Sequence, residues 1–372
     1  MEKSERLVSL DVFRGITIAG MILVNNPGSW DHIYPALEHA KWNGITPTDL
    51  IFPFFIFIVG IAITISLSKR KEEGAATKKK LYLQIIRRTA IIFILGIIMN
   101  GFPFYELSTL RIMGVLQRIA IAYLVSSIIF LKTSLRVQVF ITALLLIVYW
   151  ILMTLIPVPG VGYANLDPKM NLSAFIDRLV LGKHIWYYSK DYDPEGILST
   201  LPSIATCLIG VLTGHWLRGK ADKMTKAVWM FVCGNIMLVL GTIFDMWFPI
   251  NKNIWTSSYV IFTGGMALEF MAMCYFLIDI KGYKWWTKPF IVFGMNAIIV
   301  YFFSSIAAYA VYMPKVTGAS GEKIDFKVWL YQTLFASWLP PFNASVAWAI
   351  AYVLFWLAIM WVLYEKKIFI KV

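Results

Sequence analysis

Long apolar stretches alternate with shorter polar stretches along almost the whole chain. A transmembrane α-helix needs about 20 consecutive, predominantly apolar residues to cross the hydrocarbon core of a bilayer. Ten stretches meet this requirement, so the pattern predicts an all-α, polytopic bundle of about ten membrane-spanning helices. We expect the spans at residues 10–27, 47–68, 84–101, 112–131, 137–156, 198–217, 227–247, 256–279, 289–312 and 343–364.

One further apolar stretch, 327–340, is too short for an ordinary crossing at about 13 residues. We interpret it as a short re-entrant or interfacial helix. The alternative, an eleventh span, would move the tail at Lys366 and Lys367 to the other side of the membrane. No polar stretch is long enough to fold alone. Residues 1–372 are therefore predicted to form one transmembrane domain, whose longest polar loop is 157–197.

Composition agrees with a membrane protein, because 59% of the 372 residues are hydrophobic and only 15% are charged, against about 25% charged in soluble domains. No cleavable signal peptide is expected, since Asp11 and Arg14 interrupt the first apolar stretch. The three cysteines all lie in apolar stretches, and no pair has metal-ligand spacing. We therefore expect neither a disulfide nor a bound metal.

The basic residues that give the chain its net charge of +13 are distributed unevenly among the loops. When alternate loops are assigned to opposite sides of the membrane, 23 of the 34 lysines and arginines fall on the side of the two termini, and ten fall on the other. The positive-inside rule then predicts that both termini are cytoplasmic and that loop 157–197 is extracytoplasmic. Membrane lipid is the expected partner, and no nucleic-acid binding is expected.

The richest polar segment lies between the first two apolar stretches, at residues 25–28 and 38–44. It contains His39, one of only four histidines. Histidine can remove a proton from an amine or a hydroxyl near neutral pH. In acyl transfer from a thioester, an amide such as that of Asn25 can donate a hydrogen bond to the developing oxyanion.

Other side chains of this segment fit an interfacial binding site or an ordinary loop. Trp42 could stack on a sugar ring, and Asn43 followed by glycine suits a tight turn. Asp49 begins the second span, where its carboxylate could face the positive end of a helix or orient His39. The structural alternative for the whole segment is a solvated loop with one aromatic belt residue.

Ionisable side chains inside the predicted spans are costly and mark paired or functional positions. Asp11 and Arg14 are three residues apart, which suits an ion pair on one helical face. Arg118 could pair with Glu269 or bind a ligand. The acidic residues of loop 157–197, Glu195 among them, could form a surface for a polar substrate or a solvated cap.

Several blocks of the sequence together resemble the heparan-α-glucosaminide N-acetyltransferase family. In order along the chain, they are residues 11–15, 24–25, 39–44, 49–53, 110–118, 193–200, 251–259 and 294–297. The resemblance covers nearly the whole chain. It implies an acetyl-CoA-dependent N-acetyltransferase that moves acetyl from cytoplasmic acetyl-CoA to the amine of a terminal glucosamine on the far side of the membrane. It also implies a possible homodimer.

The resemblance assigns the catalytic role to His39 and pairs it with Asn25. His39 would act as general base or as a transient acetyl carrier, and we favour direct attack by the acceptor amine. Two further sets of residues are predicted to bind the reactants. The amino-sugar acceptor would contact Trp42, Asn43, Asp49, Glu195 and Asn296, and CoA would contact Arg14, Arg87, Arg88 and Arg118.

The chain departs from the eukaryotic members of the family in two ways. It lacks their large luminal N-terminal region and the membrane helix that follows, so we expect a bacterial inner (plasma) membrane protein. The spacer between Asn25 and His39 is also longer, and it should line the acceptor site. Two other functions remain open: a transporter of amino sugars or muropeptides, and an O-acetyltransferase of a cell-surface glycan.

Overall fold

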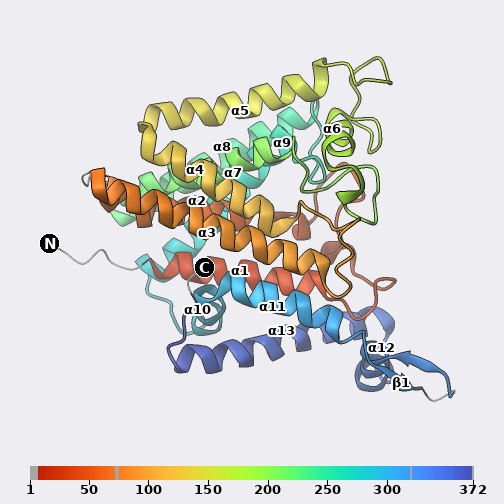
Figure 1. Cartoon of the computed structure of the whole chain (residues 1–372). Helices are drawn as coiled ribbons and strands as arrows, with labels where there is room; N and C mark the ends of the chain where they lie inside the picture. Colours follow the sequence, from red (N-terminus) through yellow and green to blue (C-terminus); the bar gives the residue numbers. More distant parts are fainter. Residues whose placement is uncertain (1–6, 72–74, 319–320, 371–372) are drawn as a thin grey trace.

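The computed structural model describes residues 7–71, 75–318 and 321–370, and it confirms the predicted polytopic helical bundle. Within these residues, nine helical stretches are long and apolar enough to cross a membrane, and one bent pair could form a tenth crossing. In Figure 1 the long helices run between the same two ends of the molecule. They are α1 (Val8–Asn25), α2 (Ile51–Lys71), α3 (Ala75–Gly101), α4 (Val115–Lys132), α5 (Leu135–Leu155), α7 (Thr200–Arg218), α8 (Lys223–Asp245), α9 (Ser257–Cys274) and α13 (Pro341–Glu365).

Short elements gather at one end of the bundle, which we call the α6 end after helix α6 (Leu172–Leu181) (Figure 1). Helix α6 lies within the predicted loop 157–197, and the side chain of Asn171 caps it by accepting a hydrogen bond from the Ala174 amide at 2.8 Å. The other short elements are the helical turns η1 (Pro35–Leu37), η2 (Pro47–Leu50) and η3 (Gly182–His184), strands β1 (Lys315–Thr317) and β2 (Lys323–Asp325), helix α12 (Phe326–Tyr331) and the π-helical turn η5 (Gln332–Ala336).

Two features of the α6 end concern the stretch before α13. Strands β1 and β2 pair antiparallel, with Lys315 opposite Asp325, and this hairpin was not predicted from the sequence. The predicted short helix at 327–340 is formed by α12 and η5, and neither is among the candidate spans. The opposite end, where α2 leads to α3 and α4 turns into α5, is called the basic end below.

The expected span at 289–312 is broken into two helices. Helix α10 (Lys288–Met295) and helix α11 (Ala297–Ala310) meet at an angle of 83°. The intervening Asn296 leaves helical geometry, and its side chain bonds the chain that follows α13. Its Nδ2 donates to the Ile368 carbonyl at 3.1 Å, and its Oδ1 accepts from the Ile370 amide at 2.9 Å. The break therefore docks the C-terminal segment.

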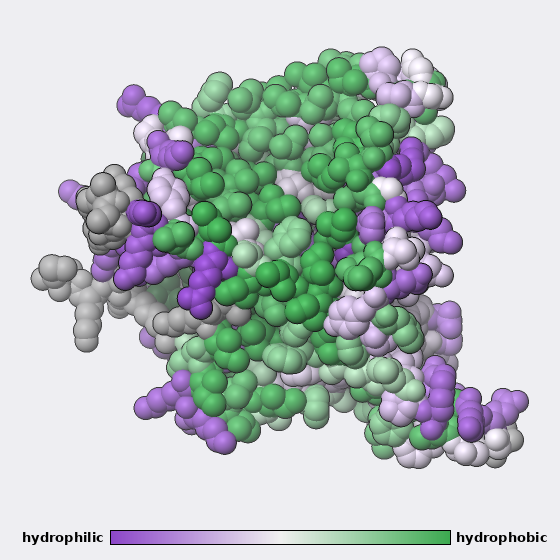
Figure 2. Space-filling view, viewed as in Figure 1, coloured by the Kyte–Doolittle hydropathy of each residue, from purple (hydrophilic) through white to green (hydrophobic). Residues whose placement is uncertain are grey.

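The molecular surface carries a broad apolar band between two more polar ends (Figure 2). Large hydrophobic side chains are exposed along α5, α8 and α13, for example Phe140, Ile236 and Phe355. Exposed apolar area of this extent is unfavourable in water and suits the hydrocarbon core of a bilayer. The chain is therefore a multi-pass membrane protein. The two N-terminal basic residues counted above, Lys3 and Arg6, lie outside the described residues.

Glycines let two pairs of helices approach at backbone distance. A Cβ at Gly60 of α2 would lie 1.9 Å from the Cys207 carbonyl oxygen of α7, and a Cβ at Gly210 would lie 2.0 Å from the Phe57 carbonyl oxygen. Gly15 of α1 and Gly294 of α10 have the same reciprocal relation. Small residues at such crossings are the usual means of close helix packing in membranes. These crossings bring α1 and α2, the helices that flank the polar segment, firmly into the bundle.

Candidate functional site

The His39 imidazole and the Asp49 carboxylate form a pair at the α6 end. Their Nδ1 and Oδ1 atoms are 2.7 Å apart. The Asp49 side chain is buried, whereas about half of the His39 side chain, 48%, is exposed. The pair thus joins a buried anion to an imidazole that reactants can reach.

The second carboxylate oxygen of Asp49 is fully occupied by its own segment. Asp49 Oδ2 accepts hydrogen bonds from the Ala40 amide at 3.1 Å, the Thr46 amide at 3.0 Å and the Thr46 hydroxyl at 3.1 Å. Thr46 and Asp49 form a capping box at the start of η2, as the sequence Thr-Pro-Thr-Asp favours. Because Asp49 is buried and bonded in this way, its position fits the interpretation as a partner that orients His39, and its predicted contact with substrate stays a prediction.

Lys252 is a third ionisable residue at this point and was not predicted as a site residue. Its Nζ lies 3.0 Å from His39 Nδ1, 3.1 Å from His39 Nε2 and 3.6 Å from Asp49 Oδ1. Burial lowers the pKa of Lys252 below its usual value, while the negative charges of Asp49 and Glu195 oppose that shift. The available signal was the block 251–259, which carries part of the family resemblance.

Trp42 and Asn43 fix the polar segment against neighbouring loops. The Trp42 indole Nε1 donates to the Leu166 carbonyl at 3.1 Å, and its ring meets that of Tyr192 edge to face. Asn43 Oδ1 accepts from Asn251 Nδ2 at 3.1 Å. Both side chains thus have structural contacts here, and their predicted contact with a sugar stays a prediction.

A second cluster of charges lies beneath the loop that precedes α7. Arg111 donates to both carboxylate oxygens of Asp193, at 2.8 and 2.5 Å, and to Glu195 at 2.5 Å. Burial alone would raise the pKa of Glu195, but the positive charges of Arg111 and Arg118 outweigh it and lower the pKa. Glu195 is only 7% exposed. In this arrangement Glu195 balances the charge of Arg111, and its predicted contact with the acceptor stays a prediction.

Arg118 is fully buried at the same end of the bundle. Its Nη2 donates to the Ser199 hydroxyl and to the Gly196 carbonyl, and its guanidinium lies 4.9 Å from the centre of the Trp255 ring. Glu269 accepts a hydrogen bond from Asn235 instead, so the Arg118–Glu269 pair considered above does not form. Two Arg118 atoms, Nε and Nη1, have no hydrogen-bond partner among the described residues.

The remaining predicted CoA ligands are spread over other helices. Arg14 pairs with Asp11 at 3.3 Å, which confirms the predicted ion pair, and also reaches the Gly294 carbonyl at 3.4 Å. Arg87 and Arg88 are exposed on α3, and Arg88 lies over the Tyr123 ring at 4.9 Å. Arg118 lies at the α6 end and is therefore not part of one phosphate site with them.

Asn296 lies at the basic end. It binds the segment after α13, whereas the first turns of α13 contact the polar segment that contains His39. Asn296 and His39 therefore lie at opposite ends of the bundle, and the predicted contact between Asn296 and the acceptor stays a prediction. Its side-chain amide holds the C-terminal segment, as described above.

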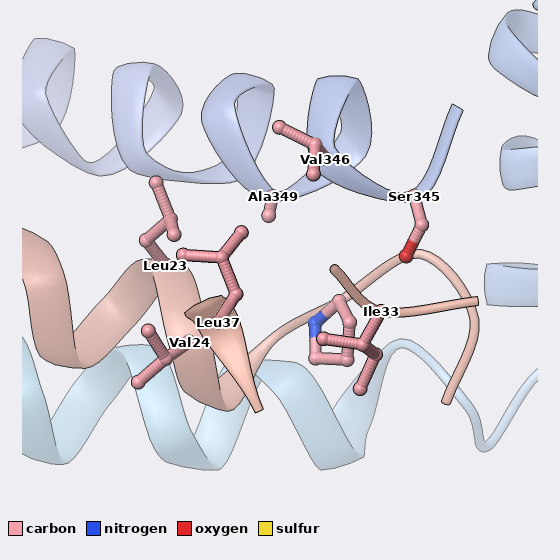
Figure 3. Close-up of a pocket in the computed structure, with 8 residues that line it drawn as sticks. Leu23, Val24, Ile33, Leu37, Ser345, Val346 and Ala349 are labelled. Carbon is pink, nitrogen blue, oxygen red and sulfur yellow. The ribbon is translucent and has the colours of Figure 1, made fainter. Parts of the chain in front are cut away.

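Asn25 is the exposed last residue of α1. Among the described residues, no hydrogen bond joins it to His39, so its pairing with His39 stays a prediction. The pocket beside it, between α1, the following segment and α13, is lined by apolar side chains such as Leu23, Val24, Leu37 and Val346 (Figure 3). This lining does not suit a sugar, and His39 is not part of it.

The segment that follows Asn25 is tied to α12 and α13. The buried Lys327 Nζ donates to the Pro27 and Gly28 carbonyls. The same ammonium group lies 5.3–5.6 Å from the ring centres of three aromatic residues, which are Tyr312, Tyr331 and Trp348. The Gly28 amide also donates to the Ser345 carbonyl at 3.1 Å. These contacts fix the end of α1 next to the site.

Fold and site together define a polytopic membrane protein with a histidine–carboxylate pair at one end of its helical bundle. The chain belongs to the heparan-α-glucosaminide N-acetyltransferase family, as predicted: the family model "Heparan-alpha-glucosaminide N-acetyltransferase, catalytic" matches residues 6–244. The matched part includes Asn25, His39 and Asp49, while Lys252 lies beyond it.

Two curated proteins are similar along nearly the whole chain. The heparan-α-glucosaminide N-acetyltransferases of Mus musculus and Homo sapiens are each 31% identical to it, over 425 and 422 aligned residues. The alignments cover 99% of this chain and 61% and 60% of those proteins. The chain thus spans about three-fifths of the length of these relatives.

Proposed function

We propose that this chain is a transmembrane N-acetyltransferase that moves an acetyl group from acetyl-CoA to the amine of a terminal glucosamine-type sugar. Family membership supports the reaction class. The observation that carries the site assignment is the 2.7 Å contact between His39 Nδ1 and the buried Asp49 carboxylate. We propose that sugar and thioester meet at the α6 end, beside His39.

The pair supports an assignment of Nε2 as the nitrogen of His39 that would act as the base. An ionised carboxylate can only accept hydrogen bonds, so Nδ1 must carry the proton in the contact with Asp49. The lone pair of Nε2 is then available to accept a proton from the acceptor. A buried carboxylate that holds the imidazole in this way has the same role as the aspartate of hydrolase triads.

In the proposed reaction, the acceptor nitrogen attacks the thioester carbonyl carbon and loses its proton to His39 Nε2. A carbon–nitrogen bond forms, the carbon–sulfur bond breaks, and the CoA thiolate receives the proton. Asn25 would donate to the carbonyl oxygen while it carries negative charge. Trp42 and Asn43, at the same end, would contact the sugar. Direct attack needs no acetyl-histidine intermediate.

Acetyl-CoA would reach the site from the basic end. Arg14, Arg87 and Arg88 would hold its phosphates there. Gln117, Arg118 and Ser127 of α4 contain buried polar atoms without hydrogen-bond partners among the described residues, spread over about 15 Å of helix. Such atoms are the donors and acceptors that the amides of a pantetheine arm require, and they support a path along α4.

The reaction can be tested by incubating the purified protein in detergent with isotope-labelled acetyl-CoA and glucosamine and measuring the labelled acetyl group on the sugar. We expect transfer by the wild type and a loss of roughly 10²–10⁴-fold in His39→Ala. His32→Ala is the matched control, because His32 lies in the same segment and contacts Ser29 and Phe342. It should keep wild-type activity.

The sugar that is acetylated or transported distinguishes the N-acetyltransferase from the O-acetyltransferase and the transporter. N-acetyltransfer requires the free amine, so N-acetylglucosamine should not replace glucosamine. Acetylation of N-acetylglucosamine would identify an O-acetyltransferase and overturn the proposed acceptor. Sugar uptake by proteoliposomes without acetyl-CoA, unchanged in His39→Ala, would overturn the transferase in favour of a transporter.

A further inference from the structure

Lys252 contacts both members of the histidine–carboxylate pair. Its Nζ is almost equidistant from the two ring nitrogens of His39, at 3.0 and 3.1 Å, and lies 3.6 Å from Asp49 Oδ1. The two lone-pair directions of an imidazole diverge, so one atom cannot lie along both. The ammonium group therefore lies over the ring, close to the carboxylate. Its side chain is only 18% exposed, which limits screening by water.

The residues just before Lys252 are bonded to the segment that carries His39. Gly44 donates its amide to the Ile250 carbonyl at 2.8 Å, and Asn251 donates its side-chain amide to Asn43 at 3.1 Å. These bonds attach the turn that carries Lys252 to the segment that carries His39. The position of the ammonium group relative to the ring is thus set by the fold.

The turn also contains a strained residue. Trp255 has a φ of +52°, in the left-handed region that a bulky side chain rarely adopts. The surrounding structure fixes this conformation: the Trp255 indole donates to Thr206 at 3.1 Å, and the Asn251 side-chain oxygen accepts from the Ile254 amide at 3.1 Å. Such strain persists where neighbouring contacts over-determine the backbone, and it concentrates at functional sites.

Opposite charges at His39 have opposite effects on its protonation. A nearby carboxylate favours the charged imidazolium, which cannot act as a base, and a nearby cation disfavours it. We propose that Lys252 is a positioning residue that counters Asp49 and keeps His39 neutral, and so able to accept a proton, at neutral pH. This role rests on the proposed function of His39 as the base.

The other charges around this cluster are accounted for. Glu195 and Arg118 are near enough to influence Lys252 and have opposite signs. Glu38 and Lys41, which flank His39 in the chain, are exposed and also opposite in sign. Each couple therefore brings charges of both signs near the site. The two charged groups in direct contact with the His39 ring are Asp49 and Lys252.

Carbethoxylation by diethylpyrocarbonate tests the role without acetyl-CoA, because a histidine reacts with this reagent only when its imidazole is neutral. The rate at His39 would be followed from pH 5 to 9 by tandem mass spectrometry, which separates His39 from His32. In Lys252→Met the midpoint of the profile should move to higher pH by about one unit. The rate below the wild-type midpoint should then be roughly tenfold lower.

Two control variants make the result specific. Lys252→Arg keeps a cation and should retain a near wild-type midpoint. Lys41→Met removes an exposed lysine two residues from His39 and should also leave it unchanged. Equal melting temperatures in detergent would exclude misfolding, and Lys252→Gln provides a second neutral variant if Lys252→Met is unstable.

The acetyl-transfer profile provides a second readout. The acid limb of kcat/KM should move with the carbethoxylation midpoint in Lys252→Met. An unchanged carbethoxylation midpoint in both neutral variants would overturn the role of Lys252. If the midpoint moves but the wild type transfers no acetyl group, the electrostatic role stands and the proposed function fails. The two proposals can therefore be judged separately.

Discussion

At the scale of single residues, the site depends on a buried carboxylate whose Oδ2 atom is held by hydrogen bonds from its own segment. The Ala40 amide and the Thr46 amide and hydroxyl occupy Asp49 Oδ2. The Tyr259 hydroxyl also donates to the Asp49 backbone carbonyl at 2.6 Å. The remaining carboxylate oxygen is thus aimed at His39, with little freedom to turn elsewhere.

Replacing Asp49 by asparagine should separate catalysis from folding. The amide has nearly the same shape, but it carries no charge and can present an N–H where Nδ1 of His39 needs an acceptor. We expect kcat for acetyl transfer to fall roughly 10²–10⁴-fold. The measurement is kcat beside the melting temperature in detergent. A variant that melts with the wild type and transfers acetyl at the wild-type rate would contradict the orienting role.

At the scale of elements, the short helix α12 and the N-terminal end of the membrane span α13 fix the segment between α1 and α2. Helix α12 is only six residues long, yet Lys327 reaches from it to the carbonyls of Pro27 and Gly28. Ser345, in the first turn of α13, exchanges hydrogen bonds with Ser29 at 3.1 Å. The predicted short helix at 327–340 is therefore an anchor for the segment that follows Asn25.

Lys327→Ala should release this segment while leaving the bundle intact. The variant loses two hydrogen bonds from a charged donor and the contacts of that ammonium with three aromatic rings. We expect the backbone amides of residues 28–37 to exchange with solvent deuterium faster by roughly tenfold or more. Lys323→Ala, an exposed lysine of strand β2, is the control. Equal exchange in the two variants would argue against the anchor.

Glycine crossings set the spacing of the spans themselves. Gly60→Ala would place a methyl group 1.9 Å from the Cys207 carbonyl oxygen, so α2 and α7 would have to move apart. We expect a loss of roughly 3 kcal/mol of stability, the upper part of the usual cost of overpacking. Thermal unfolding in detergent measures it.

Gly20→Ala is the matched control for this crossing. There the new methyl group would meet only the flexible end of the Ile51 side chain at 3.3 Å. Its melting temperature should stay close to that of the wild type. A similar loss in both variants would mean that any added methyl group is harmful, and that the close crossing is not the cause.

At the scale of the whole molecule, the distribution of basic residues and the position of the site predict one orientation. The end with most lysines and arginines should face the cytoplasm, and His39 should face the opposite side. The apolar band in Figure 2 separates these two ends. Acetyl-CoA and the acceptor sugar would then come from opposite sides of the membrane.

Labelling of single cysteines tests this orientation in intact cells. In a background without the three native cysteines, Asp31→Cys should react with a membrane-impermeant maleimide added outside. Lys132→Cys, at the basic end, should react only after permeabilisation. Both positions are exposed, so accessibility alone does not distinguish them. The reverse pattern would overturn the proposed sidedness.

The sequence by itself determined the membrane architecture and the family. Nine of the ten expected spans correspond to single continuous helical stretches, because crossing a bilayer imposes a length and an apolar composition that can be read directly. The choice of His39 as a candidate and the interpretation of Asp49 as its partner could also be made from the sequence, since the two residues are only ten positions apart. The ion pair of Asp11 and Arg14 follows from helical spacing alone.

Only the tertiary structure decided which distant side chains meet. Lys252 is 213 residues from His39 and joins it because the turn before α9 packs on the segment before α2. Glu195 pairs with Arg111, Arg118 bonds Ser199, and Asn296 bonds the C-terminal segment at the opposite end, and each of these partners lies far along the chain. Periodicity and spacing report local geometry, whereas the partners of a buried charge depend on which helices pack together.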